Sequence, residues 1–221
     1  MSNVIIFDID GVLVDSEAAI TTACMQALHE NGIPAKFDDF KAFTGMGDDK
    51  FIAGVAGLYG YAVGPEIKNR AYQIYLETAS EQVHVFDWTR PLLEHLAEKG
   101  YMLVAASSAD REKVLCNLSC IGADSALFRT VITGSEVQKK KPAPDIFVKA
   151  LSEVGGDPFH CIVAEDAVSG ILAAKAAGVV AVGVTTSFRA DALYEAGADF
   201  TVDDLMSLEQ IAESVFSMNH G

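Results

Sequence analysis

Two aspartates, Asp8 and Asp10, follow a short apolar run at residues 4–7 and stand immediately before a glycine. A carboxylate can attack phosphorus and so divide the hydrolysis of a phosphate ester into two easier steps. Because the two aspartates are two positions apart, extended backbone would point both side chains to one face. Asp and Gly also favour turns for purely local reasons, so an ordinary turn is the simpler alternative. In the chemical interpretation, Asp8 is the nucleophile and Asp10 acts first as a general acid and then as a general base.

Three further apolar runs, at residues 102–106, 130–133 and 161–164, precede other polar residues that phosphoryl transfer requires. These polar clusters are Ser107-Ser108, Lys139-Lys140-Lys141 and Glu165-Asp166. Serine hydroxyls and the Lys141 ammonium can donate hydrogen bonds to phosphoryl oxygens. Each cluster alone also has a simpler explanation, since serines cap helices, lysine runs face solvent, and acidic pairs suit helix N-termini. Their occurrence together, each after a predicted strand, favours the chemical interpretation.

The acidic residues could also hold a metal ion. A carboxylate nucleophile and a phosphate ester are both negatively charged, so they repel each other on approach. A hard divalent cation with oxygen ligands, typically Mg²⁺, removes that repulsion. Asp8 and Asp166, with Glu165 beside them, could bind it. We therefore expect Mg²⁺ as the cofactor and a small phosphorylated metabolite as the substrate.

The spacing of the apolar runs indicates how these clusters are positioned. A fifth run lies at residues 179–182, and amphipathic helical stretches lie at residues 91–99, 110–120, 144–154 and 168–177. Glycines mark the helix ends at positions 100, 122, 155 and 178. Apolar strands without alternation favour a parallel sheet covered by helices on both faces. In such a sheet, ligands bind beyond the carboxyl ends of the strands, where the polar clusters stand.

The stretch from Glu17 to Val83 breaks the alternation of strands and helices. Its periodicity is helical, and it contains no convincing strand. The expected helices run over residues 18–30, 37–42, 48–58 and 65–79. We therefore predict an α/β chain whose core comprises residues 1–16 and 84–221, with a separate small helical domain at residues 17–83.

Composition narrows the possible partners. The chain has 221 residues, half of them hydrophobic, and a net charge of −15, which argues against nucleic acid and anionic membranes as partners. No apolar stretch reaches the roughly 18 residues that a membrane span needs, and the first residues lack the features of a signal peptide. The four cysteines show no metal-site spacing, so we expect reduced, mostly buried thiols. These features predict a cytoplasmic protein, either a monomer or a weak dimer.

Four motifs, in order along the chain, resemble those of the haloacid dehalogenase superfamily. They are residues 8–16 (DIDGVLVDS), 105–108 (AASS), 141–147 (KPAPDIF) and 164–170 (AEDAVSG). The resemblance implies a Rossmann-like core with a helical cap inserted after the first strand. It implies Asp8 as the nucleophile and Asp10 as the acid and base. It further implies Ser107 and Lys141 as phosphate ligands and Asp166 as a metal ligand, with the backbone carbonyl of Asp10 also on the metal.

The resemblance also narrows the reaction. Haloacid dehalogenases usually lack an acid at the position of Asp10, and phosphonoacetaldehyde hydrolases carry alanine there, so Asp10 favours phosphate-ester chemistry. The chain is similar to the β-phosphoglucomutase and sugar-phosphatase branch. Mutases of that branch typically have a histidine at the position of Ile20 and a cap arginine at the position of Asp48. These departures favour a phosphatase, with a phosphoryl-transfer mutase as the alternative and a non-enzymatic binding protein as a third interpretation.

Substrate specificity is expected to lie in the helical insertion rather than in the core motifs. The segment Gly45-Met46-Gly47 is expected to contact the substrate, because a cap needs a flexible segment that faces the core site. Lys50 is the cation nearest in the sequence to Asp48, which stands at the position of the mutase arginine. The candidate specificity residues are therefore Gly45, Met46, Gly47 and Lys50.

Overall fold

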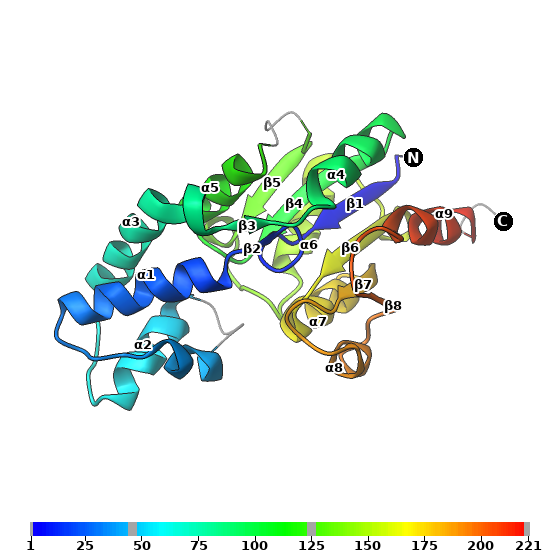
Figure 1. Cartoon of the computed structure of the whole chain (residues 1–221). Helices are drawn as coiled ribbons and strands as arrows, with labels where there is room; N and C mark the ends of the chain where they lie inside the picture. The colour runs from blue at the N-terminus through cyan, green and yellow to red at the C-terminus, as the bar shows by residue number, and fades with distance from the viewer. Residues whose placement is uncertain (1, 44–47, 123–126, 219–221) are drawn as a thin grey trace.

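The computed structural model describes residues 2–43, 48–122 and 127–218 of the chain. Figure 1 shows a layered α/β body beside a smaller group of helices. The body contains a six-stranded sheet of order β5-β4-β1-β6-β7-β8, in which all neighbours are parallel. Its strands are β1 (Val4–Phe7), β4 (Met102–Ser107), β5 (Thr130–Thr133), β6 (Cys161–Glu165), β7 (Val180–Val184) and β8 (Phe200–Val202).

The central strand β1 shows why these apolar runs form strands. All four of its residues are buried, because helices cover both faces of the sheet. Phe7 at its end is in register with Ala105 of β4 and Ala164 of β6. The residues that follow these three positions therefore emerge side by side at one edge of the sheet.

Helices form the outer two layers of the body. On one face, α4 (Thr89–Glu98), α5 (Arg111–Ile121) and α9 (Leu208–Met218) pack against Ile5 and Phe7. On the other face, α6 (Asp145–Val154), α7 (Val168–Ala176) and α8 (Ala190–Glu195) pack against Val4 and Ile6. Two short 3₁₀ helices, η2 (Gly134–Glu136) and η3 (Pro158–His160), connect these elements. The layers confirm the predicted α/β class with a Rossmann-like core.

The smaller group of helices consists of α1 (Glu17–Glu30), η1 (Phe37–Phe43), α2 (Asp48–Leu58) and α3 (Pro65–Gln82). These helices enclose a hydrophobic cluster of their own, which includes Leu28, Phe40 and Tyr75. Where the chain leaves and re-enters the body, the short strands β2 (Val14–Asp15) and β3 (His84–Val85) pair antiparallel. Both features support our proposal that residues 17–83 form a cap domain on a core of residues 1–16 and 84–221.

Some elements differ from the sequence-based predictions. The segment at residues 37–42 forms a 3₁₀ helix rather than an α-helix. The predictions missed the helices α8 and α9, the strand β8 and the β2–β3 pair. The missed strands have only two or three residues each, which is too few side chains to show a period. The helix-ending glycines at positions 100, 122, 155 and 178 all have positive φ, as expected for C-terminal positions.

The cysteines agree only in part with the expectation that they are mostly buried. Cys24 and Cys161 are buried, whereas Cys116 and Cys120 are half-buried on α5, where they pack against the hydrophobic cluster of the smaller helical group. All four are free thiols. No described helix combines the length and the apolar character that crossing a membrane requires.

Candidate active site

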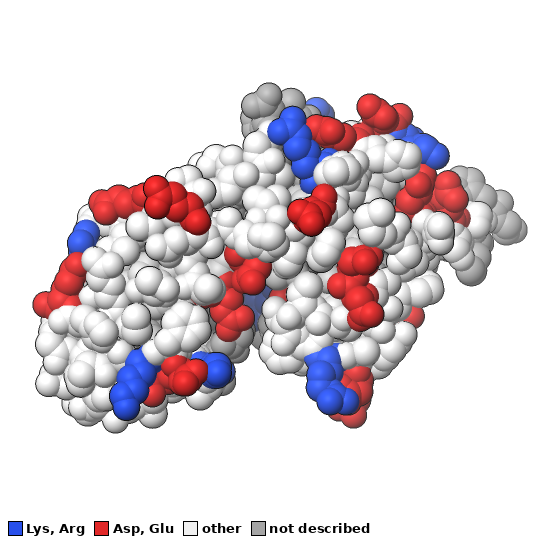
Figure 2. Space-filling view, viewed as in Figure 1, with Lys and Arg blue, Asp and Glu red and all other residues white. Residues whose placement is uncertain are grey.

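The carboxyl ends of the parallel strands open onto a cavity of about 400 Å³. All core residues to which the sequence assigned a catalytic, phosphate-binding or metal-binding role line it, namely Asp8, Asp10, Ser107, Ser108, Lys141, Glu165 and Asp166. Glu17, Ile20 and Phe51 of the smaller helical group line the same cavity. The cavity therefore lies between the sheet edge and that group, and Figure 2 shows acidic side chains gathered where the two parts of the molecule meet.

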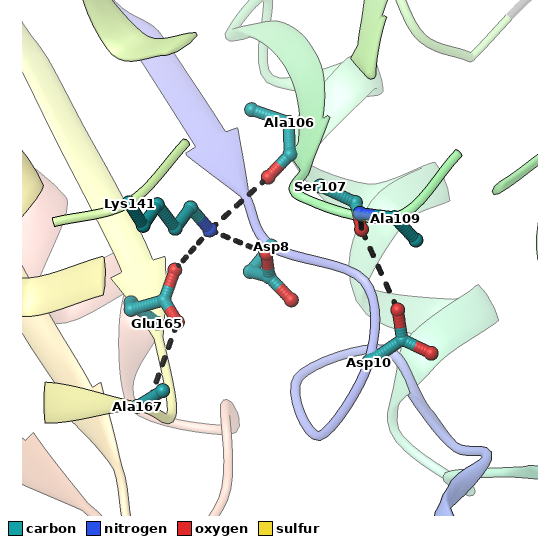
Figure 3. Close-up of polar contacts among 8 residues, drawn as sticks. All are labelled: Asp8, Asp10, Ala106, Ser107, Ala109, Lys141, Glu165 and Ala167. Atoms are coloured by element: carbon teal, nitrogen blue, oxygen red, sulfur yellow. Dashed lines mark hydrogen bonds and ion pairs between the residues drawn. The ribbon is translucent and has the colours of Figure 1, made fainter. Parts of the chain in front are cut away.

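Lys141 joins two buried carboxylates at the floor of the cavity. Its Nζ donates hydrogen bonds to Asp8 Oδ1 at 2.5 Å and to Glu165 Oε2 at 2.6 Å, and it contacts the carbonyl of Ala106 at 3.4 Å (Figure 3). The Lys141 side chain is only 5% exposed. A single ammonium group thus neutralises part of the negative charge that β1 and β6 bring together.

These charges perturb one another strongly. Burial raises the pKa of Asp8 to about 7, and Glu165 and Asp10 add to this effect while Lys141 opposes it. Burial also disfavours the charged form of Lys141, but the carboxylates of Asp8 and Glu165 outweigh it and raise the pKa of the ammonium. Strongly shifted groups in a cavity are typical of catalytic sites.

Three carboxylates lie close enough together to hold a divalent cation. Oxygen atoms of Asp8, Glu165 and Asp166 lie within 4.8 Å of one another, and all three residues are buried. Burial and repulsion from Glu165 and Asp8 raise the pKa of Asp166 well above its usual range. Three buried carboxylates with one lysine leave negative charge unneutralised, and an all-oxygen donor set is what Mg²⁺ prefers. These residues fit the metal that the sequence predicted.

Two glycines allow this close approach of acidic side chains. Gly11 has a φ of +80°, and a Cβ there would lie 1.9 Å from Asp166 Oδ2. A Cβ on Gly170 would likewise lie 1.9 Å from the carboxyl carbon of Glu165. Neither position could carry a side chain without displacing one of these carboxylates, which explains why glycine stands in both motifs.

Asp10 points to a different part of the cavity from Asp8. The extended backbone expected between them is wrong, because β1 ends at Phe7 and the chain bends at Ile9. Figure 3 shows Asp8 directed toward Lys141 and Asp10 directed toward Ser107. Ser107 Oγ donates to Asp10 Oδ2 at 3.4 Å, and Ser107 is itself nearly fully buried at the end of β4.

The serine pair stands where a phosphoryl group would meet the sheet edge. The backbone N–H of Ala109 donates to Ser107 Oγ at 3.2 Å, which orients this hydroxyl. The Ser108 Oγ is buried and has no hydrogen-bond partner among the described residues. A buried hydroxyl without a partner costs free energy unless a ligand satisfies it, so Ser108 fits the predicted role of a phosphate ligand.

The haloacid dehalogenase-like hydrolase family matches residues 5–184, a range that contains all the motif residues described above. The chain belongs to this family. It is 34% identical over 206 residues to validoxylamine A 7'-phosphate phosphatase from Streptomyces hygroscopicus subsp. limoneus, covering 93% of this chain and 95% of the relative. The family and this relative agree with the enzyme class that the sequence predicted, a hydrolase of phosphoric monoesters.

Two further similarities extend over most of the hydrolase. It is 35% identical over 205 residues to the Arabidopsis thaliana protein SUPPRESSOR OF QUENCHING 1, chloroplastic, which covers 91% of this chain but only 19% of that much longer protein. A solved structure, a hydrolase from Pseudomonas syringae, gives a TM-score of 0.80 at 26% identity and covers 96% of this chain and 99% of its own. The fold of the hydrolase is thus shared over nearly its whole length.

The site of this hydrolase contains a second buried cation, Lys113, that was not predicted from the sequence. Lys113, on α5, is buried and places its Nζ 3.2 Å from Asp10 Oδ1. Asn117, one turn later, donates from Nδ2 to the same oxygen at 3.0 Å, and Ser16 Oγ donates to it as well. The sequence contained a sign of this role, because Lys113 and Asn117 are four residues apart and interrupt the otherwise apolar face of α5.

The candidate specificity residues are only partly placed. Gly45, Met46 and Gly47 lie outside the described residues. Lys50 on α2 is exposed and does not line the cavity, whereas its neighbour Phe51 does. Lys139 and Lys140 are both exposed, in agreement with a lysine run that faces solvent. Lys140 also lines the rim of the cavity and lies 3.6 Å from Asp110.

Proposed function

We propose that this hydrolase removes phosphate from a small phosphorylated metabolite in a Mg²⁺-dependent reaction that passes through an aspartyl-phosphate on Asp8. The observation that carries the proposal is the buried cluster of Asp8, Lys141, Glu165 and Asp166 at the sheet edge. It combines a nucleophile, a fixed ammonium group and an oxygen donor set.

In the first half-reaction, an oxygen of Asp8 attacks phosphorus and the bond to the ester oxygen breaks. Asp10 gives its proton to the departing oxygen, which leaves as an alcohol. Ser107, Ser108 and Lys141 donate hydrogen bonds to the phosphoryl oxygens. Mg²⁺, held by Asp8, Glu165, Asp166 and the backbone carbonyl of Asp10, would reduce the repulsion between the nucleophile and the phosphate.

In the second half-reaction, water attacks the phosphorus of the aspartyl-phosphate. Asp10, now ionised, accepts a proton from this water, and the bond between phosphorus and Asp8 breaks. Inorganic phosphate and the free Asp8 carboxylate result. Burial would raise the pKa of Asp10, but the charge of Lys113 and hydrogen bonds from Ser16, Lys113 and Ser107 lower it. Asp10 is therefore better suited to accept the proton in this step than to donate one in the first half-reaction.

Replacement of Asp10 tests its role in the first half-reaction. We expect Asp10→Ala to lower kcat/KM for an alkyl phosphate by roughly 100-fold or more, because general acid catalysis typically contributes that much. The loss for p-nitrophenyl phosphate should be much smaller, since its leaving group needs no proton. Steady-state rates on both esters measure this, and kcat/KM excludes the later hydrolysis of the aspartyl-phosphate. Equal losses on the two esters would contradict a proton donor at Asp10.

The described cap residues favour a phosphatase over a mutase. A mutase must hold a bisphosphate in two orientations, which demands a cation that faces the distal phosphate. The described cap residues that line the cavity are Glu17, Ile20 and Phe51, and none of them is a cation. Arg70 is not available for this role, because it donates two hydrogen bonds to Glu30, at 2.7 and 2.9 Å.

We therefore expect net phosphate release from small monophosphates. Interconversion of β-glucose 1-phosphate and glucose 6-phosphate should be slow even when the 1,6-bisphosphate is supplied, because the cap contributes the acidic Glu17 to the cavity lining, which disfavours a second phosphate. Parallel assays of inorganic phosphate and of sugar phosphate isomers measure both rates on one sample. Isomerisation faster than phosphate release would show that the protein is a mutase and not a phosphatase.

A further inference from the structure

A buried chain of polar side chains runs from cap helix α3 to the carboxylate of Asp10. Tyr75 on α3 donates from its hydroxyl to Oδ1 of Asn117, and Asn117 donates from Nδ2 to Asp10 Oδ1 at 3.0 Å. Tyr75 and Asn117 are both fully buried. Tyr75 is 42 residues from Asn117 in the sequence, and Asn117 is 107 residues from Asp10. The geometry of these hydrogen bonds therefore depends on how α3 packs against α5.

The two oxygens of Asp10 have different surroundings. Oδ1 receives hydrogen bonds from Ser16 and Asn117 and lies 3.2 Å from the Lys113 ammonium. A carboxylate oxygen accepts about two hydrogen bonds through its lone pairs, so Oδ1 is saturated. Oδ2 accepts a long hydrogen bond, at 3.4 Å, from Ser107 Oγ at the cavity wall. Oδ2 is therefore the oxygen with capacity left to exchange a proton with a substrate or a water.

Tyr75 determines which way the Asn117 amide faces. An amide has an oxygen that accepts and a nitrogen that donates, and a carboxylate can only be approached by the nitrogen. Burial raises the pKa of Tyr75, so its hydroxyl keeps its proton and acts as a donor to the amide oxygen. With the oxygen bound in this way, Nδ2 is directed at Asp10.

Lys113 completes the arrangement. Its side chain is 6% exposed, and its Nζ lies 5.7 Å from the centre of the Tyr75 ring as well as beside Asp10. The ammonium thus packs between the cap tyrosine and the carboxylate. A charge buried to this degree needs its partner in a fixed place, which restrains Asp10 as much as it restrains Lys113.

We propose that Tyr75, Asn117 and Lys113 are positioning residues that hold Asp10 through Oδ1 and leave Oδ2 to transfer the proton. The inference rests on the proposed function, in which Asp10 is the acid and base. It assigns to the cap a part in the chemistry itself, because a hydroxyl on α3 fixes the orientation of a carboxylate that belongs to the core.

Two variants and one matched control test this arrangement. Tyr75→Phe removes only the hydroxyl and keeps the ring beside Lys113, while Lys113→Met removes the charge and keeps most of the side-chain volume. Tyr59→Phe is the control, because the Tyr59 hydroxyl also donates to a side-chain oxygen, Asp39 Oδ2 at 2.6 Å. Asp39 lies within the cap and does not line the cavity, whereas the hydrogen bonds from Tyr75 lead to Asp10, which does. For each protein, kcat/KM is measured with Mg²⁺ on p-nitrophenyl phosphate and on an alkyl phosphate, and the thermal midpoint is recorded.

The ratio of the two kcat/KM values separates positioning from stability. We expect Tyr75→Phe to lower kcat/KM for the alkyl phosphate about fivefold to tenfold relative to p-nitrophenyl phosphate, which corresponds to one lost hydrogen bond. Lys113→Met should change this ratio by roughly 100-fold, as displacement of a catalytic group can. Tyr59→Phe should leave the ratio unchanged even if it lowers the midpoint.

The outcomes that overturn the inference are distinct from failure of the proposed function. If both variants lose activity equally on the two esters, or if Tyr75→Phe behaves as Tyr59→Phe does, the residues are structural and the inference is wrong. If the wild-type protein releases no phosphate from either ester in the presence of Mg²⁺, the proposed function itself is wrong.

Discussion

Replacement of Asp8 by asparagine is expected to lower phosphate release by several orders of magnitude while the protein stays folded. Asparagine has nearly the same shape but lacks the charge that attacks phosphorus. The fold should tolerate the change, because burial and the neighbouring carboxylates already disfavour the charged form of Asp8. Phosphate release from p-nitrophenyl phosphate measures the activity, and circular dichroism with a thermal melt measures the fold.

Asp15→Asn is the matched control for this variant. Asp15 also lines the cavity, but it is exposed and lies outside the buried acidic cluster. We expect this control to keep most of the wild-type activity. A rate for Asp8→Asn above about a tenth of the wild-type rate would contradict covalent catalysis, because such a loss is only about 1.4 kcal/mol of the activation barrier.

Removal of the metal is expected to have a comparable effect. Activity should vanish in excess chelator and return when Mg²⁺ is added. Asp166→Ala should abolish activity or raise the Mg²⁺ concentration that it requires, since it removes one of three converging carboxylates. Thermal melts give a second readout, because a ligand that binds the folded state stabilises it by about 2.7 kcal/mol at 100 times its Kd.

The thermal readout separates metal binding from catalysis. Mg²⁺ should raise the midpoint of the wild-type protein and raise that of Asp166→Ala much less. Lys141 and Glu165 remain in this variant, so the rest of the cluster stays in place. Full activity of the wild-type protein in excess chelator would refute the metal-dependent mechanism. A reaction of the dehalogenase type would then have to be considered again.

Much of the core site could be predicted from the sequence for a simple geometric reason. Parallel strands end at the same edge of a sheet, so polar residues that follow apolar runs must converge there. The register of β1 with β4 and β6 realises this convergence and brings Asp8, Ser107 and Glu165 to one cavity. The order of strands and polar residues along the sequence was therefore sufficient to predict that these three residues lie at one site.

The rest of the site depends on packing that local sequence does not encode. Lys113 and Asn117 look like ordinary helix residues until α5 is placed beside the loop after β1. Tyr75 reaches Asn117 only because α3 lies against α5. The bend at Ile9 could not be predicted from spacing either, and it is what sends Asp10 away from Asp8. Contacts of this kind follow from the tertiary arrangement of the helices.

Trapping of the intermediate tests the central claim most directly. Enzyme that is turning over p-nitrophenyl phosphate with Mg²⁺ is quenched in acid, digested and analysed by mass spectrometry. The account predicts a peptide containing Asp8 that has gained one phosphoryl group, and fragmentation should place the group on the Asp8 carboxylate. The same peptide from Asp8→Asn should carry none. Rapid phosphate release with no phosphorylated Asp8 under conditions that preserve acyl phosphates, or with the phosphoryl group on another residue, would contradict the account.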